Sequence, residues 1–190
     1  GMSGSPLLQG DLVVVPAGGK NDRSLVAYRM DNGEPAWNGG GDRAGYSSPL
    51  YTVLAGTPQI LILNSGSVAS HDPATGRVLW QAPWSRSNPN VAQPLPVPGD
   101  RVLVSSGYGV GCALFNVRKG PGGGLEVAQA WKTPSLKAKF ANFVRREGFV
   151  YGLDDGILVC LDLETGGRRW KAGRYGHGQM LLVGGLLLLT

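Results

Sequence analysis

The stretch Ser70-His71-Asp72-Pro73-Ala74-Thr75-Gly76-Arg77-Val78-Leu79-Trp80 decides the fold, because it returns near the end of the chain as Cys160-Leu161-Asp162-Leu163-Glu164-Thr165-Gly166-Gly167-Arg168-Arg169-Trp170. In both copies an Asp precedes a Gly by four residues, and a Trp follows that Gly by four. A looser copy runs from Ala27 to Trp37 and keeps the step from Gly33 to Trp37. Such repetition identifies a recurring structural unit, so the fold must be one that is built from repeats.

The spacing of four tryptophans predicts the architecture. Trp37, Trp80, Trp131 and Trp170 are separated by 43, 51 and 39 residues, and periods of about 40 to 50 with several short strands are typical of propeller blades. Short runs of Val, Leu and Ile between turn residues favour an all-β chain. We therefore predict a β-propeller of four-stranded blades, with about four blades and a partial fifth in an incomplete ring. As a single domain it would occupy residues 5–190, with blades near 5–41, 46–84, 91–133 and 140–175 and a partial unit at 177–190.

Each residue of the repeated phrase has a structural task. The carboxylates of Asp72 and Asp162 are expected to accept backbone N–H groups two or three residues further on. The Gly gives the turn a conformation that a Cβ would oppose, and the Trp is expected on the outer strand, covering the joint to the next blade with one acceptor for its indole N–H. The two Asp residues recur in one blade position, so we do not expect a catalytic acid–base pair. In the third unit, the glycine-rich segment 119–124 replaces the compact turn.

Composition and charge exclude several classes of function. The net charge is +5, and the segment from Lys132 to Arg174 holds nine basic and five acidic residues. This excess predicts a solvated rim, with a docking face for an acidic partner as the alternative. The basic residues are scattered and form no nucleic-acid-binding motif, so no nucleic-acid partner is predicted. The apolar end from Met180 to Leu189 is far shorter than the roughly 20 residues of a membrane-spanning helix.

The remaining candidate residues are few. Cys160 occupies the repeat position of Ala27 and Ser70, which predicts a buried thiol, whereas Cys112 lies beside a glycine-rich connection and is expected to be partly exposed. A disulfide between these two cysteines is disfavoured, because equivalent strands of neighbouring blades stand too far apart. His71 is expected to pack in the core. The polar side chains expected to line the central channel are Asn142, Arg145, Arg146 and His177.

The phrase, its period and its Val- and Leu-rich strands resemble the quinoprotein-like, or PQQ-like, propeller repeat. The resemblance covers nearly the whole chain from about Ser5, and it specifies the fold better than the function. Its members include quinone-dependent alcohol dehydrogenases and cofactor-free scaffolds, and they are commonly exported. It therefore implies a periplasmic or extracellular location, although no secretory signal is present in this sequence. The enzymes carry adjacent cysteines and a Glu/Asn/Asp set around calcium, whereas Cys112 and Cys160 are 48 residues apart and no such set is evident.

The sequence accordingly favours a non-enzymatic protein-interaction scaffold of the bacterial cell envelope, without a cofactor and with an unknown protein partner. The alternatives are a fragment of a quinone- and calcium-dependent alcohol or sugar dehydrogenase, and a carbohydrate-handling propeller. The last unit matches the opening of a blade and lacks the phrase, so we expect a piece of a longer propeller. An open propeller leaves sheet faces and edges exposed, which predicts either an irregular ring or self-association.

Overall fold

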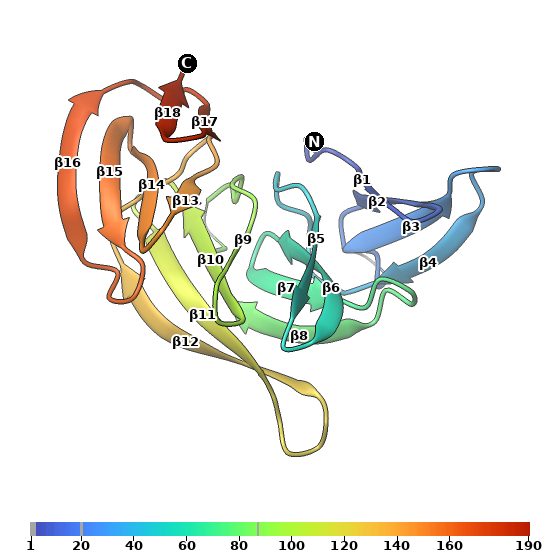
Figure 1. Ribbon diagram of the computed structural model, residues 1–190. Helices are drawn as coiled ribbons and strands as arrows, with labels where there is room; N and C mark the ends of the chain where they lie inside the picture. The colour runs from blue at the N-terminus through green and yellow to red at the C-terminus, as the bar shows by residue number, and fades with distance from the viewer. Residues whose placement is uncertain (1–2, 20, 87) are drawn as a thin grey trace.

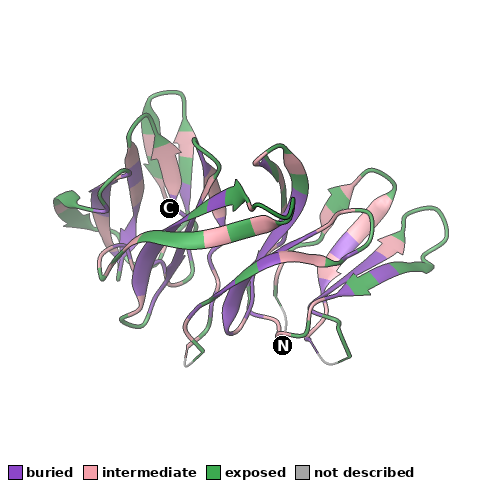
Figure 2. Cartoon of the chain, turned by 90° about the horizontal axis from the view of Figure 1, so that it is seen from below, coloured by how far each residue is buried: buried purple, intermediate pink, exposed green. Residues whose placement is uncertain are grey.

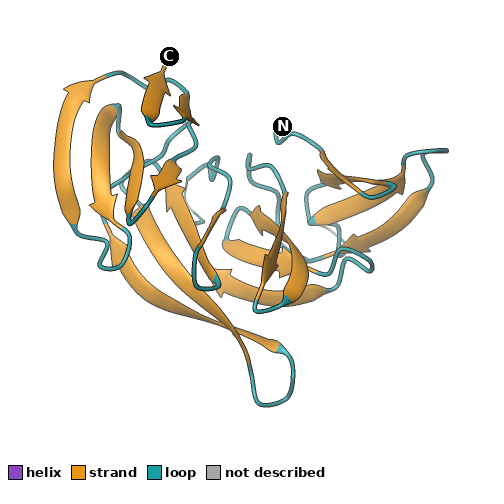
Figure 3. Ribbon diagram, in the orientation of Figure 1, coloured by secondary structure: helices purple, strands orange, loops and turns teal. Residues whose placement is uncertain are grey.

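The computed structural model describes residues 3–19, 21–86 and 88–190, and these residues form strands and loops with no helix (Figure 3). Four sheets have four strands each, and a fifth has two. Sheet A contains β1 (Leu7–Gln9), β2 (Leu12–Pro16), β3 (Leu25–Arg29) and β4 (Pro35–Gly39), and sheet B contains β5 (Leu50–Leu54), β6 (Thr57–Leu63), β7 (Ser67–His71) and β8 (Val78–Pro83). Sheet C contains β9 (Leu95–Val97), β10 (Arg101–Ser106), β11 (Gly111–Lys119) and β12 (Leu125–Thr133). Sheet D contains β13 (Val144–Arg146), β14 (Phe149–Asp154), β15 (Ile157–Asp162) and β16 (Arg168–Arg174), and sheet E contains β17 (Met180–Val183) and β18 (Leu186–Leu189).

Within each sheet the strands pair antiparallel in the order of the sequence. The first strand of every sheet lies on the inside of the arc, and β4, β8, β12 and β16 lie on its outside (Figure 1). The sheets follow one another around an arc that does not close, so the predicted propeller architecture and its incomplete ring are confirmed. Each sheet buries at least one face against a neighbouring sheet, which is how a small open sheet becomes stable in a propeller.

One inner strand differs from the sequence expectation. From the sequence, Ser47-Ser48-Pro49-Leu50 is expected to enter the second sheet; only the last of these residues, Leu50, is in a strand, and β5 runs on from it to Leu54. The hairpin to β6 turns at Ala55 and Gly56, which both have positive φ (49° and 68°). This turn conformation is usually marked by Asn-Gly or Asp-Gly. Because Ala-Gly occupies the turn instead, the sequence did not indicate this hairpin.

Hydrophobic clusters fill the joints between consecutive sheets. Ile60 and Ile62 of sheet B pack against Val14 and Leu25 of sheet A, and the joints between B and C and between C and D hold larger clusters. A smaller cluster joins sheet D to β17 and β18 through residues such as Met180. Figure 2 shows the buried residues concentrated on strands, whereas exposed residues occupy the loops and also parts of some strands, such as β12 and β16. The core is therefore a series of joints rather than one central cluster.

The glycine-rich insertion of the third unit lengthens a hairpin. Strands β11 and β12 have nine residues each and pair as far as Lys119 and Leu125. Their tip protrudes beyond the other sheets (Figure 1). The insertion therefore removes the compact turn from sheet C, as the sequence indicated, and replaces it with a projecting arm.

Both ends of the arc expose apolar side chains. On sheet E the outward-facing residues are Leu181, Val183, Leu186 and Leu188, which are between 49% and 69% exposed. They form two directly opposed pairs, Leu181 with Leu188 and Val183 with Leu186. At the other end, Leu8 of sheet A is 63% exposed.

Candidate functional site

The tryptophan of one sheet binds the turn of the next. The Trp37 indole Nε1 donates to the Pro73 carbonyl oxygen at 3.0 Å, and Trp131 Nε1 donates to the Leu163 carbonyl oxygen at 3.0 Å. In each case the ring lies against the glycine of that turn, Gly76 or Gly166. Because a Cβ at either glycine would collide with the ring, the phrase requires Gly for its contact as well as for its positive φ.

The aspartates hold these turns in shape. The Asp72 Oδ1 atom accepts the backbone N–H groups of Ala74 and Thr75, both at 2.9 Å, and the Thr75 hydroxyl at 3.1 Å. Asp162 repeats this pattern with the N–H groups of residues 164 and 165 and with the Thr165 hydroxyl. Hydrogen bonds, first of all from Arg169, lower the pKa of Asp162 to about 2. In the first, looser copy the corresponding turn starts at Arg29, whose carbonyl oxygen accepts the Gly33 N–H, so an arginine stands where the other two copies have Asp.

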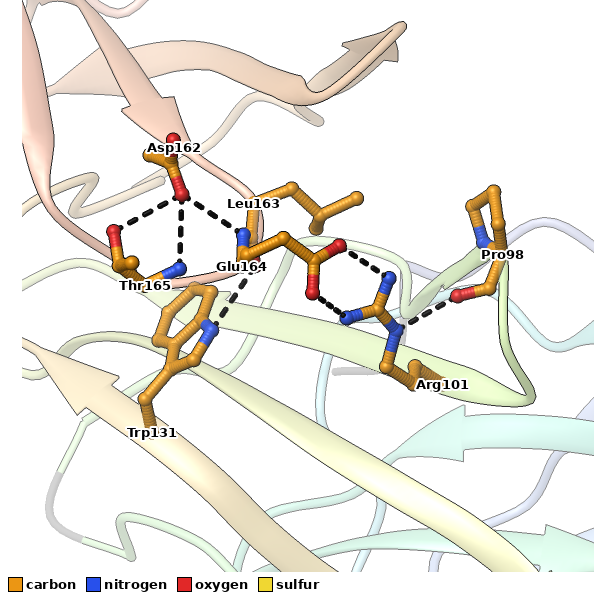
Figure 4. A network of polar contacts seen from close by, with 7 residues as sticks. All are labelled: Pro98, Arg101, Trp131, Asp162, Leu163, Glu164 and Thr165. Carbon is orange, nitrogen blue, oxygen red and sulfur yellow. Dashed lines mark hydrogen bonds and ion pairs between the residues drawn. The ribbon is translucent and has the colours of Figure 1, made fainter.

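A bidentate ion pair reinforces the joint between sheets C and D (Figure 4). Arg101 donates from both terminal nitrogens to Glu164, at 2.7 and 2.8 Å, and from Nε to the Pro98 carbonyl oxygen. The hydrogen bond from Arg101 lowers the pKa of Glu164. Together with Trp131, this pair fixes both sides of the 163–165 turn (Figure 4).

Trp80 departs from this rule because the neighbouring sheet C has no compact turn. Its Nε1 donates instead to Gln59 Oε1, within its own sheet, at 2.7 Å. The same oxygen accepts the Ser70 hydroxyl at 2.6 Å, and Gln59 Nε2 donates to the Leu54 carbonyl oxygen. Gln59 is completely buried. A core glutamine thus substitutes for the missing turn.

Trp170, in the last complete sheet, has no such partner in the described part of the chain. It is 43% exposed, and Tyr151 lies beside it with 6.1 Å between the ring centroids. At the other end of the arc, Gly33 has no atom within 4 Å of the position of a Cβ. At one end of the arc Trp170 therefore contacts no turn of a next sheet, and at the other end no tryptophan covers the turn at Gly33.

Polar residues just before the inner strands link neighbouring units. Ser5 N–H donates to Ser48 Oγ at 2.8 Å, Gln93 N–H donates to Asn142 Oδ1 at 2.8 Å, and Gln179 Nε2 donates to the Phe140 carbonyl oxygen at 3.0 Å. The side chain of Asn142, predicted to line the channel, is thus engaged in a bond between units. These contacts tie the inner edges of successive sheets together.

The other three residues predicted to line the channel lie nearby. Arg145 donates to the Glu147 carbonyl oxygen, and Arg146 donates to the Gly185 carbonyl oxygen of the final hairpin, both at 2.9 Å. His177 stacks edge-on against Phe140, with 5.9 Å between the ring centroids. Arg146 and Asn142 therefore bridge structural units, and a role for any of the four in ligand binding stays a prediction.

Both cysteines are free and buried, which corrects the expectation that Cys112 is partly exposed. Cys112 lies in the joint between sheets C and D, and burial raises its pKa and that of Cys160. His71 is completely buried, as expected from its repeat position. Its Nδ1 lies 2.9 Å from the Gly76 carbonyl oxygen, and its Nε2 has no partner among the described residues. Burial lowers the pKa of His71, although the bond to Gly76 opposes that shift.

A buried carboxylate anchors the connection between sheets C and D. Asp154 is 2% exposed, and its two oxygens each lie 2.5 Å from an ammonium group, Lys137 Nζ on one side and Lys171 Nζ on the other. Burial alone would raise the pKa of Asp154, but the hydrogen bonds from these two lysines outweigh it and hold the pKa below its usual value. This cluster is fully paired and acts as a structural clamp on the connection.

A groove that the sequence did not indicate runs along the three connections that join sheets A, B, C and D. We call it the connector groove, and it consists of three adjoining hollows. The outer hollow is lined by Asp42, Arg43 and Arg86, among others. The middle hollow shares Ser65 and Arg86 with it, and the inner hollow, of about 260 Å³, shares Tyr46 and Pro89 with the middle one.

The inner end of the connector groove is apolar. Tyr46, Val91 and Phe140 line it, and each precedes the first core residue of an inner strand by four positions, namely Leu50, Leu95 and Val144. Tyr46 is 39% exposed and Phe140 is 48% exposed. That shared spacing was the sequence signal for this surface, which was visible only once the inner strands were located.

The arrangement of possible metal ligands and of the two cysteines bears on the quinone-dependent alternative. No group of three or more His, Cys, Asp or Glu side chains that could hold a metal occurs in the described ranges. The two cysteines lie on separate strands of neighbouring sheets, β11 and β15. The same part of the chain also has no helix that could cross a membrane.

Comparisons with known proteins agree with this fold. No curated protein matches the sequence. BamB from Moraxella catarrhalis is similar in structure, with a TM-score of 0.73 and 18% identity over 97% of this chain and 56% of that one. A europium-containing methanol dehydrogenase has a TM-score of 0.68 and 12% identity, and the match covers 95% of this chain and 48% of that one. A quinohemoprotein alcohol dehydrogenase from Comamonas testosteroni has a TM-score of 0.63 and 13% identity, and the match covers 100% of this chain and 39% of that one.

At these identities the likeness concerns the fold alone, and the chain spans about half the length of the solved structures that it matches. The sequence itself matches a family model from residue 1 to residue 172. That family, one of PQQ-like repeats, is described as outer membrane protein assembly factor BamB. On this match, the chain belongs to the BamB family of PQQ-like propeller proteins.

Proposed function

We propose that this chain is a non-enzymatic propeller that binds other proteins in the bacterial cell envelope. The observation that carries the proposal is a set of three exposed aromatic residues, Tyr46 and Phe140 on connections between sheets and Tyr108 on the β10–β11 loop. Beside them lie Arg43, Arg86 and Lys139, which form no ion pair with a carboxylate among the described residues. Exposed aromatic and Arg side chains are typical of protein-binding surfaces. The family description, an assembly factor for outer membrane proteins, supports both the role and the location.

Site-specific photo-crosslinking in the source bacterium tests this proposal. A photoreactive amino acid in place of Tyr108 or Phe140 should yield a discrete adduct with another protein after irradiation. The same amino acid in place of Arg77, which follows the turn at the opposite end of sheet B, serves as the matched control. Adducts of equal yield from all three positions, or from none, would contradict a dedicated binding surface.

The alternative is that the chain forms part of a quinone-dependent dehydrogenase, for which the fold likeness to two such enzymes is the support. Incubation with calcium and the quinone, followed by absorbance spectra and dye-linked alcohol oxidation, separates the two functions. We expect neither saturable binding nor oxidation. Saturable quinone binding would replace the scaffold proposal.

A further inference from the structure

We propose that the connector groove binds an extended acidic segment of a partner protein, with an apolar or aromatic residue of that segment in the inner hollow. The inference rests on the proposed function and makes it specific, because it assigns the binding surface and the chemistry of its ligand. Three features of the groove carry it: unpaired positive charge at one end, an apolar recess at the other, and a rigid floor between them.

The outer end has an excess of positive charge, because two arginines, Arg43 and Arg86, share it with one carboxylate, that of Asp42. Arg43 and Arg86 are exposed, and neither forms an ion pair with a carboxylate among the described residues. Asp42 lies in the same hollow, but its Oδ1 accepts Arg43 N–H and its Oδ2 accepts Gly66 N–H and the Ser67 hydroxyl. That carboxylate therefore serves the connection itself, and the two guanidinium groups remain available for acidic side chains.

The inner end offers an apolar recess beside further positive charge. The ring of Phe140 meets Tyr108 edge-on, with 6.5 Å between the centroids. Lys139 Nζ stands 4.5 Å from the centroid of the Tyr108 ring. With Tyr46, Pro89 and Val91 on the other walls, this end suits an apolar or aromatic side chain next to an acidic one.

The floor between the two ends is fixed by Asn90, which is 1% exposed. Its Nδ2 group donates to the carbonyl oxygens of residues 64, 65 and 85, and its Oδ1 accepts the Ser106 hydroxyl at 2.7 Å. Its own carbonyl accepts Tyr46 N–H at 2.8 Å. Because the connection that carries Tyr46, the connection that carries Asn90 and the β6–β7 loop are held together in this way, this part of the groove is formed before a ligand arrives, which lowers the cost of binding.

The extended shape of the groove favours a peptide segment over a small molecule. The three hollows adjoin in sequence through the residues they share, so a ligand that reaches both ends must run along them. An extended chain with acidic residues followed by an apolar anchor meets each end with the matching chemistry. The positive net charge of the protein also favours the approach of an acidic segment.

The test is selection from a random peptide library displayed on phage, with the purified chain as bait. Enriched peptides are then synthesised with a fluorescent label, and their affinity is measured by fluorescence polarisation. We expect an enriched class that carries Asp or Glu within a few residues of Phe, Tyr, Trp or Leu. An Arg43→Ala/Arg86→Ala double variant should bind this class about tenfold more weakly, and Tyr46→Ser or Phe140→Ser should weaken it by at least about tenfold.

The matched control is the Arg77→Ala/Arg168→Ala double variant, which removes the same charge from exposed positions next to the opposite turns. It should retain the affinity of the unchanged chain, and urea unfolding of every variant checks that the fold is intact. Peptides that bind but are insensitive to all the groove variants would overturn the groove while leaving the proposed function standing. The absence of any enriched peptide class would count against both.

Discussion

Trp131 and Gly166 belong to neighbouring sheets and are in direct contact, since a Cβ on Gly166 would lie 2.6 Å from the Trp131 Cε3 atom. Trp37 and Gly76 have the same relationship one joint earlier. The glycine of the repeated phrase therefore serves two purposes at these joints, a positive φ and room for a ring. These two roles can be measured separately, because one copy of the glycine has no ring against it.

Gly166→Ala and Gly33→Ala should differ in their effect on stability. Both glycines have positive φ, 69° and 74°, but only Gly166 is covered by a tryptophan. Gly33→Ala should cost about 1 kcal/mol through backbone strain alone. Gly166→Ala should cost about 2 to 4 kcal/mol, because the new methyl group also displaces the ring. Urea unfolding measures both values, and equal losses would show that the ring contact is unimportant.

Gln59→Leu should destabilise the chain by about 2 to 4 kcal/mol, because the Trp80 N–H and the Ser70 hydroxyl both lose their buried acceptor. Denaturant unfolding followed by tryptophan fluorescence is the measurement. Gln129→Leu, at an exposed position of β12, is the control and should change stability by less than about 0.5 kcal/mol. Combining Gln59→Leu with Trp80→Phe should recover part of the loss, since Phe has no donor to satisfy. A Gln59→Leu chain of unchanged stability would refute the role assigned to this side chain.

Stability should fall on mild acidification because of His71. Its pKa is lower in the folded chain than in the unfolded chain, so the unfolded state takes up the proton first. The stability that neutral, buried His71 contributes is therefore fully present above the pKa of the unfolded chain, about 6.5. It is lost as the pH falls from there toward the lower pKa of the folded chain. Unfolding between pH 7.5 and 5 measures the effect. His71→Leu should flatten the profile in this range, and a profile that keeps its slope in this variant would refute the assignment to His71.

Neither thiol should react in the folded chain. Cys112 and Cys160 are free and buried, and burial raises the pKa of both, so little thiolate is exposed to reagent. A colorimetric disulfide reagent should label no thiol in buffer and two in denaturant. Fast labelling of Cys112 in buffer would mean that the joint between sheets C and D opens readily.

The exposed apolar face of sheet E should drive self-association. Multi-angle light scattering of the unchanged chain should give a mass that rises with concentration. A Leu181→Lys/Leu186→Lys double variant should remain monomeric, because lysines on this face oppose its burial. Met30→Lys, at an exposed turn of sheet A, is the control and should associate like the unchanged chain. A concentration-independent monomer for the unchanged chain would refute this prediction.

The repeat predicted most of the fold, because one phrase marks the same turn wherever it occurs. It could not predict which atoms receive the indole N–H groups, since these belong to the neighbouring unit. The exception at Trp80 depends on Gln59, a residue outside the phrase, and on the insertion in the adjacent sheet. The burial of Cys112 was missed because its glycine-rich neighbourhood suggested an exposed loop, whereas β11 already begins at Gly111.

The connector groove was missed for a different reason. Arg43, Arg86 and Phe140 lie on three separate connections, and only the arrangement of the sheets along the arc brings these connections to one surface. Neither charge nor hydropathy along the sequence marks such a surface. The equal spacing of Tyr46, Val91 and Phe140 from the inner strands becomes evident only after the register of those strands is known.

The division of the core into joints has a thermodynamic consequence. Each hydrophobic cluster in the described chain belongs to one pair of neighbouring sheets, so cooperativity should be of the nearest-neighbour kind rather than global. Sheets B, C and D each have two neighbours, whereas sheets A and E have one. Amide hydrogens of the middle sheets should therefore exchange with solvent most slowly, and unfolding should proceed inward from the two ends of the arc.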